Sequence, residues 1–422
     1  MDAASIDRAA CLARDLADPL AACRSAFALP PDLIYLDGNS LGPLPHAAAA
    51  RIARTVTHDW GHGLIRSWND AGWIDLPERV GDRIAALIGA APGSVTAGDS
   101  TSINLFKALN AALGLPGPAG GRRTILSDTG NFPTDLYVAQ GVCAASGGRL
   151  RLRTVPPDGL AAAVDGDTAI VMATHVDFRT GRMHDMRGVT EAAHAAGAVM
   201  VWDLAQSAGA VPLDLAGSGA EFAVGCGYKY LNGGPGAPGF IHVRPDLQDR
   251  VTPALCGWMG HAAPFDFAPG FAPAAGARRQ QVGTPPILSL AALDAALEVW
   301  QEVDMAAVRQ KSLALGDLFI ALVERDCAGL GLTLATPRSH EARGSQVSFT
   351  AGPELAGGYP VMQALIADGV IGDFRAPDLL RFGFTPLYLR HVDVFDAAAR
   401  LHRILAQRRW DRPQFHARAA VT

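Results

Sequence analysis

Short apolar runs alternate with helical patterns through the middle of the chain. The apolar runs are rich in branched and aromatic residues, which favour strands, and they cover residues 124–127, 150–155, 169–175, 198–203, 221–226 and 239–243. Between them, apolar positions recur at helical spacing, as in 133–146 and 187–197. This alternation predicts an α/β fold with a mostly parallel central sheet flanked by helices, and such sheets bind ligands at the carboxyl ends of their strands.

The two ends of the chain follow other patterns. Near the start, helical spacing covers 7–26 and 46–60, and PPDLIYLDGNSLGPLP between them is predicted to form a short strand and a turn. Toward the end, a long helical stretch covers 286–323. The remaining elements are short strands at 346–350, 370–375 and 379–384, interleaved with helices near 358–368 and 393–407.

These patterns predict three parts. At 422 residues the chain is long enough for one large domain and a smaller one. We expect residues 1–60 to form an N-terminal segment that packs with the small domain. Residues 61–300 are predicted to form the large domain with the parallel sheet, and residues 301–422 the small α+β C-terminal domain.

Composition excludes several classes of protein. Hydrophobic residues make up 49% of the chain and charged residues 18%, which is typical of a well-buried globular protein. A net charge of -5 gives no basic surface for nucleic acid. The sequence holds neither an apolar run of membrane-spanning length nor a signal-peptide pattern. The six cysteines are scattered without metal-site spacing, so we expect a reduced, cytoplasmic protein without a metal.

Lysine is rare, and one lysine follows a predicted strand. Of 36 basic residues only Lys107, Lys229 and Lys311 are lysines, and Lys229 stands in GCGYKYLNGGPGAPG after strand 221–226. Lysine can lose its proton and attack a carbonyl, whereas arginine stays protonated. Asp203 ends another predicted strand. A carboxylate and a lysine on such strand ends suit pyridoxal phosphate, with the carboxylate on the ring nitrogen and the lysine in a Schiff base. An ordinary helix cap and a surface lysine remain the alternatives.

A phosphate group needs hydroxyls and free backbone N–H groups. In DSTSINLFKAL, Ser100, Thr101 and Ser102 precede a helical stretch, and a helix N-terminus binds anions. A plain helix cap explains the same residues equally well. GNFPTDLY places Phe132 and Asp135 at another turn from strand to helix. There Phe132 either stacks on a cofactor ring or packs the loop.

Two further motifs resemble a dinucleotide-binding loop and a metal site only in part. GPGAPG at 234–239 matches the dinucleotide pattern G-x-G-x-x-G, but prolines interrupt it and a predicted strand follows where a helix is needed. His58 and His62 have the spacing of metal ligands on a helix, but no glutamate lies between them and Gly61 weakens the helix. Neither motif therefore predicts a nicotinamide or metal site.

Ten segments, in order along nearly the whole chain, together resemble kynureninases, most closely the bacterial enzymes: IYLDGNSLGPLP, LIRSWNDAGW, STSINLFKAL, NFPTDLY, THVDFRTGRMHDM, WDLAQSAGAVPLDL, GCGYKYLNGGPGAPGF, GWMGH, VGTPPILS and LRFGFTPLY. The resemblance implies a fold-type I pyridoxal-phosphate enzyme of the class-V aminotransferase-like superfamily. It further implies a cytoplasmic homodimer of tryptophan catabolism. Such an enzyme hydrolyses L-kynurenine, and 3-hydroxykynurenine less well, to anthranilate and L-alanine.

The matched motifs also imply residue roles. Lys229 forms the Schiff base, Asp203 pairs with the ring nitrogen, and Tyr228 handles a proton. The other cofactor-binding positions are Thr101, Ser102, Phe132, Asp135, Thr174, Gln206, Trp258 and Thr284, with Tyr228 also on the phosphate and with Trp258 and Thr284 contributed by the partner subunit. The substrate-binding positions are Ser40, Trp68 and Arg381, whose planar guanidinium suits a bidentate pair with a carboxylate.

One position departs from the family pattern. Gln206 stands where kynureninases usually have histidine, so it keeps a hydrogen-bond donor but cannot titrate. Cysteine desulfurases and selenocysteine lyases of the same fold carry glutamine there, which makes such an activity the main alternative. Those enzymes need a nucleophilic cysteine, and Cys327 is the only candidate in range. A cofactor-binding paralogue without catalysis is a second alternative.

Overall fold

The computed structural model describes residues 6–115 and 120–418, and they divide into two units. Unit 1 comprises the described parts of 1–46, 179–183 and 299–422, and unit 2 comprises those of 47–178 and 184–298. The early part of the chain is thus shared between the units, because residues 47–60 belong to unit 2. The boundary after residue 298 lies close to the predicted end of the large domain.

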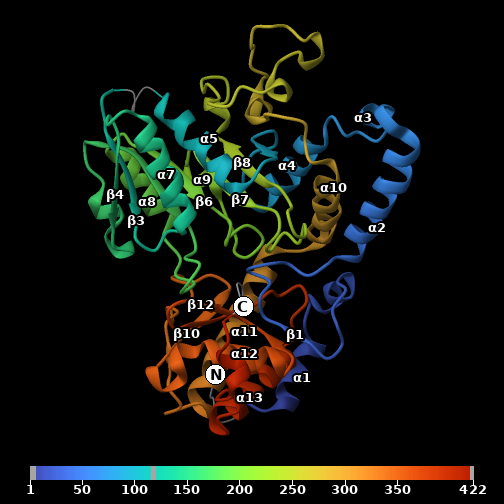
Figure 1. Ribbon diagram of the computed structural model, residues 1–422, viewed down its shortest axis with the longest axis vertical. Coiled ribbons are helices and arrows are strands. Elements are labelled where there is room, and N and C mark those ends of the chain that lie inside the picture. The colour runs from blue at the N-terminus through green and yellow to red at the C-terminus, as the bar shows by residue number, and fades with distance from the viewer. Residues whose placement is uncertain (1–5, 116–119, 419–422) are drawn as a thin grey trace. The chain divides into compact units, whose positions relative to one another are not determined.

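Unit 2 is built on a seven-stranded sheet with the order β2-β8-β7-β6-β5-β3-β4 (Figure 1). Neighbouring strands from β4 to β7 run parallel, and β8 is antiparallel to both β7 and β2. The strands are β2 (Val95–Ala97), β3 (Thr124–Asp128), β4 (Arg151–Val155), β5 (Thr168–Thr174), β6 (Val199–Asp203), β7 (Phe222–Cys226) and β8 (Gly239–Val243). All six apolar runs predicted as strands are confirmed.

Helices cover the sheet of unit 2. Helix α5 packs on β7 and β8, α8 on β6, α7 on β4 and α4 on β2. Every residue of β5, β6 and β7 is buried, which explains why these strands are continuous apolar runs. The α-helices are α2 (His46–Arg54), α3 (Ser67–Asp70), α4 (Leu76–Leu87), α5 (Thr101–Leu113), α7 (Pro133–Ala145), α8 (Met186–Ala195), α9 (Leu215–Ser218) and α10 (Ile287–Ala296).

Unit 1 combines a four-stranded antiparallel sheet with helices (Figure 1). Its core includes Phe319, whose ring contacts Phe349, Phe382 and Phe384. The sheet has the order β12-β13-β10-β9, and β1 pairs in parallel with β11. The elements are α1 (Arg8–Leu16), β1 (Ile34–Tyr35), α11 (Met305–Asp326), β9 (Leu332–Leu334), β10 (Gln346–Ala351), α12 (Tyr359–Ala367), β11 (Val370–Ile371), β12 (Asp373–Arg375), β13 (Leu379–Gly383), α13 (His391–Ala406) and α14 (Pro413–His416).

Short helices complete both units. A π-helix, η3 (Thr55–Gly63), continues α2. The 3₁₀ helices are η2 (Ala21–Ala26), η4 (Leu64–Arg66), η5 (Pro157–Gly159), η6 (Ala161–Ala163), η7 (Pro245–Leu247), η8 (Trp258–Gly260), η9 (Pro264–Asp266), η10 (Gly276–Gln280), η11 (Leu297–Glu302) and η12 (Pro353–Gly358). In the described ranges no helix is both long and apolar enough to cross a membrane.

Three predicted elements were wrong in detail. The helix predicted over 7–26 ends at Leu16, because the residue before Pro19 is disfavoured in a helix. The helix predicted over 286–323 is interrupted before α11, where Asp304 caps the new helix by accepting from Ala306 N. The strand predicted over 370–375 is two strands, β11 and β12, which belong to different sheets.

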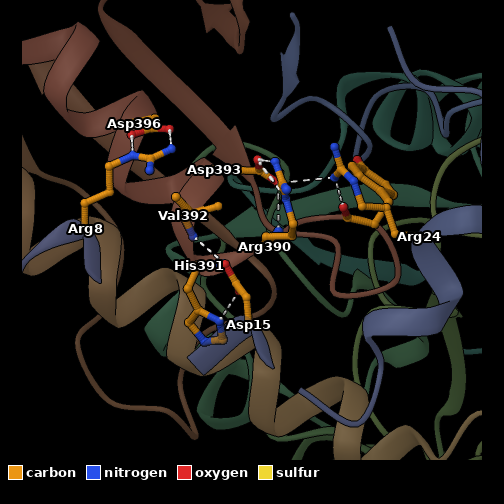
Figure 2. A network of polar contacts seen from close by, with 9 residues as sticks. Arg8, Asp15, Arg24, Arg390, His391, Val392, Asp393 and Asp396 are labelled. Atoms are coloured by element: carbon orange, nitrogen blue, oxygen red, sulfur yellow. Dashed lines mark hydrogen bonds and ion pairs between the residues drawn. The ribbon is translucent and has the colours of Figure 1, made fainter. Parts of the chain in front are cut away.

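The N-terminal segment of unit 1 is fixed to the start of α13 (Figure 2). The Asp15 carboxylate accepts from the backbone N–H groups of His391 and Val392, at 2.6 and 3.0 Å, and lies 2.9 Å from His391 Nδ1. Arg8 forms a bidentate pair with Asp396. Asp15 therefore satisfies backbone donors that α13 itself leaves open. These contacts fix the segment that leads to β1 within the small unit.

Candidate active site

A cavity of about 130 Å³ lies in unit 2, where the carboxyl ends of several strands meet. It gathers many of the predicted cofactor residues. Those that line it are Thr101, Ser102, Phe132, Asp135, Thr174, Asp203, Gln206, Tyr228 and Lys229. Ser100, which the sequence offered for the phosphate beside Thr101 and Ser102, also lines the cavity. The lining residues that the sequence did not single out are Thr134, Phe178, Ala205, Ala237 and Gly239. The pattern of strands and strand ends was therefore enough to find this place in the fold.

Two buried carboxyl groups face each other in this cavity. Asp203 and Thr174 are register partners at the ends of β6 and β5, and Thr174 Oγ1 lies 3.4 Å from both Asp203 Oδ2 and Asp135 Oδ2. Ala205 N donates to Asp203 Oδ1 at 2.7 Å. Burial raises the pKa of Asp203, and burial together with the Asp203 charge raises the pKa of Asp135 well above its usual range. The surroundings thus favour the protonated form more strongly at Asp135 than at Asp203.

Lys229 is held on a tight turn between β7 and β8. Its carbonyl accepts from Asn232 N at 3.0 Å, and Asn232 has a positive φ of 58°. Lys229 Nζ lies 5.9 Å from the ring centre of Phe132 and 5.8 Å from that of Tyr228. Burial raises the pKa of Tyr228, helped by Cys226 and Asp203, so this hydroxyl stays protonated at neutral pH. The lysine thus lies beside a protonated phenol and an aromatic face.

The start of α5 forms a cradle for an anion. Ser100 is the N-cap and accepts from Ile103 N at 3.4 Å, and Thr101 donates to Gly225 O at 3.1 Å. The first N–H groups of a helix have no partner within it, and the helix dipole favours a negative charge there. A Cβ at Gly239 would lie 2.9 Å from Thr101 N, so only glycine lets this strand approach the helix start. The cradle fits the phosphate of the expected cofactor.

Aromatic rings and Gln206 complete the cavity. Phe132 contacts Phe178 edge to face, with 5.1 Å between ring centres. Phe178 was missed, although THVDFRTG, which contains it, was among the segments that carry the family resemblance. Gln206 lines the cavity with only 3% of its surface exposed, so the glutamine that departs from the family pattern lies within the candidate site itself.

Three predicted residues of unit 2 lie outside this cavity. Thr284 lines two other hollows, one shared with Ser100 and Tyr228 and one with Lys107. Trp258 begins η8 and contacts Phe265 edge to face. Trp68 contacts Trp73 edge to face. The roles predicted for Trp258 and Thr284 belong to a partner subunit's site and stay predictions.

The predicted substrate residues Arg381 and Ser40 lie together in unit 1. Arg381 is 1% exposed and donates from Nη2 to Ser40 Oγ at 2.6 Å and to Asp373. Asp373 also forms an ion pair with Arg375, whose Nε lies 2.6 Å from Asp373 Oδ2. Asp37 Oδ1 lies 3.8 Å from Arg381 Nη2. Burial and the charge of Asp373 raise the pKa of Asp37 to about 6.

Metal and thiol chemistry find little support in the site. No group of three or more His, Cys, Asp or Glu side chains suited to a metal occurs among residues 6–115 and 120–418. Cys327 is buried at the end of α11, and burial together with Asp326 raises the pKa of its thiol to about 12. A thiol in that state is a poor nucleophile.

Solved structures share the fold of this chain. A C-DES mutant with glycine covalently linked to its PLP cofactor has a TM-score of 0.77 at 20% identity, over 90% of this chain and 98% of that one. A cysteine desulfurase from Thermococcus onnurineus has a TM-score of 0.75 at 19% identity, over 92% and 98%. Both structures confirm the predicted fold-type I architecture.

The sequence relatives are more specific. Residues 308–401 match the family model of the kynureninase C-terminal domain. A kynureninase of Burkholderia pseudomallei is 55% identical over 413 residues, which are 97% of this chain and 98% of the relative. A kynureninase of Pseudomonas fluorescens is 53% identical over 414 residues, which are 98% and 99%. The chain therefore belongs to the kynureninase family.

Proposed function

We propose that this chain hydrolyses L-kynurenine to anthranilate and L-alanine with pyridoxal 5'-phosphate bound in the cavity of unit 2, in tryptophan catabolism. The observation that carries the proposal is the cavity itself, which places Lys229 beside the buried pair of Asp203 and Asp135 in a chain 53–55% identical to kynureninases. 3-Hydroxykynurenine is the slower substrate.

The residues around the cavity fit the parts of the cofactor. Lys229 would be the attachment point for its aldehyde, and Asp203 would pair with its ring nitrogen. The start of α5 would hold the phosphate through Thr101 and Ser102, and Phe132 would stack on the ring. When bound, pyridoxal phosphate supplies an electron sink that stores the electron pair of a bond broken next to the substrate's amine-bearing carbon.

The chain's own groups move the protons. The Lys229 amine would act as the base that removes the proton from the substrate α-carbon. The Tyr228 hydroxyl keeps its proton at neutral pH and can give it to an oxygen of the substrate when water adds to the γ-carbonyl. Thr174 and Asp135 lie beside Asp203 and orient its carboxylate. Gln206 would donate a hydrogen bond to the phenolic oxygen of a bound cofactor.

Arg381 recognises the substrate carboxylate. Its planar fork suits two parallel hydrogen bonds to a carboxylate, and Ser40 and Asp373 already fix one side of the fork. Trp68 belongs to the substrate pocket. The functional form is a cytoplasmic homodimer in which Trp258 and Thr284 reach the phosphate of the partner subunit.

The alternative of a cysteine desulfurase rests on Gln206 and on the fold. It needs a thiolate on an accessible segment, and Cys327 is buried with a raised pKa. The alternative of a paralogue without catalysis predicts decay of the reactive groups. Instead Lys229, Asp203 and Arg381 are all present, and the first two line one cavity.

The decisive experiment follows the reaction products. Purified protein is mixed with pyridoxal phosphate and L-kynurenine, and anthranilate is followed by fluorescence while alanine is measured separately, with 3-hydroxykynurenine in parallel. We expect anthranilate and alanine in equal amounts. A yellow, cofactor-loaded protein that leaves both substrates intact would contradict the proposed reaction, and Gln206→His would then test whether the glutamine is the cause.

A further inference from the structure

A buried lysine links the phosphate cradle to a distant segment of unit 2. Lys107 lies on α5, two turns after the cradle, and is 1% exposed. Its Nζ donates to Asp99 Oδ2 at 2.9 Å and to the carbonyl of Gln280 at 2.7 Å. The proposed reaction uses neither contact, although burying a lysine is costly unless its charge is compensated. Burial lowers the pKa of Lys107, and the pair with Asp99 opposes that shift.

Asp99 is the residue directly before the N-cap of α5. Its backbone has a positive φ of 50°, a conformation that persists for such a residue only where its surroundings hold it. Its carbonyl accepts from Gly239 N at 2.8 Å. Asp99 also lines the hollow that Ser100, Tyr228 and Thr284 border. A carboxylate at this place is a negative charge next to a site built for a phosphate.

Charge is the reason why Lys107 matters to the cradle. An unpaired Asp99 carboxylate would repel the phosphate dianion and would cancel much of the favourable field of the helix start. The Lys107 side chain is 2% exposed and the Asp99 side chain 32% exposed, so solvent screens the Asp99 charge only in part, and the ammonium of Lys107 neutralises it from 2.9 Å. A cation near a helix N-terminus does not stabilise the helix itself, so helix stability gives no reason for a lysine here.

The second contact of Lys107 is with Gln280, in the run ARRQQV at residues 277–282. Arg279 is buried and donates to the carbonyl of Ala274 at 2.9 Å, and it pairs with Asp249. Gln281 donates to Glu78 at 2.9 Å. Through these bonds and the bond from Lys107 to Gln280 O, the run is attached to the body of unit 2.

The two groups assigned to the partner's phosphate, Trp258 and Thr284, lie next to this run. Only Gly283 separates the run from Thr284. Met259 N donates to Val282 O at 3.3 Å, and a Cβ at Gly257 would lie 2.0 Å from the same oxygen, so the segment with Trp258 packs on the run. Lys107 and Thr284 also border one hollow of about 70 Å³.

We propose that Lys107 is a positioning residue of the cofactor phosphate site, which neutralises Asp99 beside the cradle and fixes the segment that carries Thr284. The proposal rests on the proposed function, because it takes pyridoxal phosphate as the ligand. It predicts that Lys107 acts on the phosphate group of the cofactor and not on its ring.

The test compares two cofactor forms and two lysines. Dissociation constants of pyridoxal phosphate and of pyridoxal, which lacks the phosphate, are measured for the full-length apoprotein by absorbance. In Lys107→Met the dissociation constant of pyridoxal phosphate should rise by about 10- to 100-fold, whereas that of pyridoxal should stay within about 3-fold of the wild-type value. The matched control is Lys311→Met, since Lys311 is also buried and bonds to a carboxylate, Asp18, and a carbonyl, Pro386 O. It should change neither constant.

A charge-compensating pair of variants keeps the test independent of folding. Asp99→Asn should bind pyridoxal phosphate as tightly as the wild type or more tightly, and Lys107→Met/Asp99→Asn should recover most of the affinity lost in Lys107→Met. Equal weakening of both cofactor forms in Lys107→Met, or no recovery in the double variant, would overturn the proposal. Failure of the wild type to bind pyridoxal phosphate would instead overturn the proposed function, which kynurenine turnover tests separately.

Discussion

Each unit buries a pair of carboxyl groups beside a cation, and the two cations differ. In unit 2, Asp203 and Asp135 lie in the cavity of Lys229. In unit 1, Asp373 and Asp37 lie beside Arg381. Lysine can give up its proton and form a covalent bond, whereas arginine keeps its charge and its planar fork. The same arrangement of acids therefore supports bond-making chemistry in one unit and recognition of an anion in the other.

The protons on the acids differ as well. In unit 2 both carboxyls are buried, and burial together with the Asp203 charge raises the pKa of Asp135 further than that of Asp203. In unit 1 Asp373 is paired with two arginines, and Asp37 has a pKa raised to about 6. A neighbouring acid thus raises the pKa of a buried carboxyl, as at Asp135 and Asp37, whereas the Arg381 guanidinium opposes that rise at Asp37.

The largest effect should come from removing the cation of unit 2. Lys229→Ala loses both the attachment point of the cofactor and the base at the α-carbon, so we expect kcat/KM to fall by more than about 10⁴-fold. Absorbance titration should show that added pyridoxal phosphate no longer gives the band of the lysine-bound cofactor. Substantial turnover by this variant with added cofactor would contradict the assignment.

Replacing each acid of unit 2 by an amide should reduce turnover to different extents. Asp203→Asn loses the charge that pairs with the ring nitrogen, and we expect kcat to fall by about 10²- to 10³-fold. Asp135→Asn replaces a group that is already neutral and should cost less than about 10-fold. Steady-state kinetics of both variants measure the ratio. Equal losses would mean that the proton is not held on Asp135.

Changing the cation of unit 1 should affect binding more than chemistry. Arg381→Lys keeps the charge but loses the bidentate fork, so kcat/KM should fall by about 10- to 100-fold, mostly through KM. The absorbance of the bound cofactor should stay that of the wild type, which serves as the control for folding. A change in the spectrum with an unchanged KM would place Arg381 on the cofactor instead.

The smallest effect concerns the pH dependence of KM. The pKa of Asp37 is raised to about 6, so its carboxyl is neutral below that pH and ionised above it. The ionised form competes with the substrate carboxylate for Arg381, so KM should rise by about 3- to 10-fold as pH increases through 6. In Asp37→Asn that rise should disappear. A KM profile identical to that of the wild type would show that Asp37 does not face the bound substrate.

Local patterns predicted much of the fold and of the candidate site. The apolar runs marked the strands of unit 2, since strands buried on both faces need no polar alternation. Asp203 and Lys229 were found because polar groups directly after such runs lie at a strand end. Ser100 was found because a serine before a helical pattern is a cap, which the structure confirms through its bond from Ile103 N. Helix ends were predicted less well where turns interrupt a continuous apolar pattern.

The sequence by itself determined most of the elements and their order, because these depend on side-chain periodicity and local backbone preference. It placed several element ends wrongly, as in 7–26, 286–323 and 370–375. Tertiary structure alone decided which distant groups meet. Lys107 and Gln280 are far apart in the chain, as are Asp15 and α13, and no local sequence pattern predicts either contact. Tertiary structure alone also decided the raised pKa of Asp135, because this shift depends on burial and on the neighbouring Asp203 charge, which only the folded chain brings together.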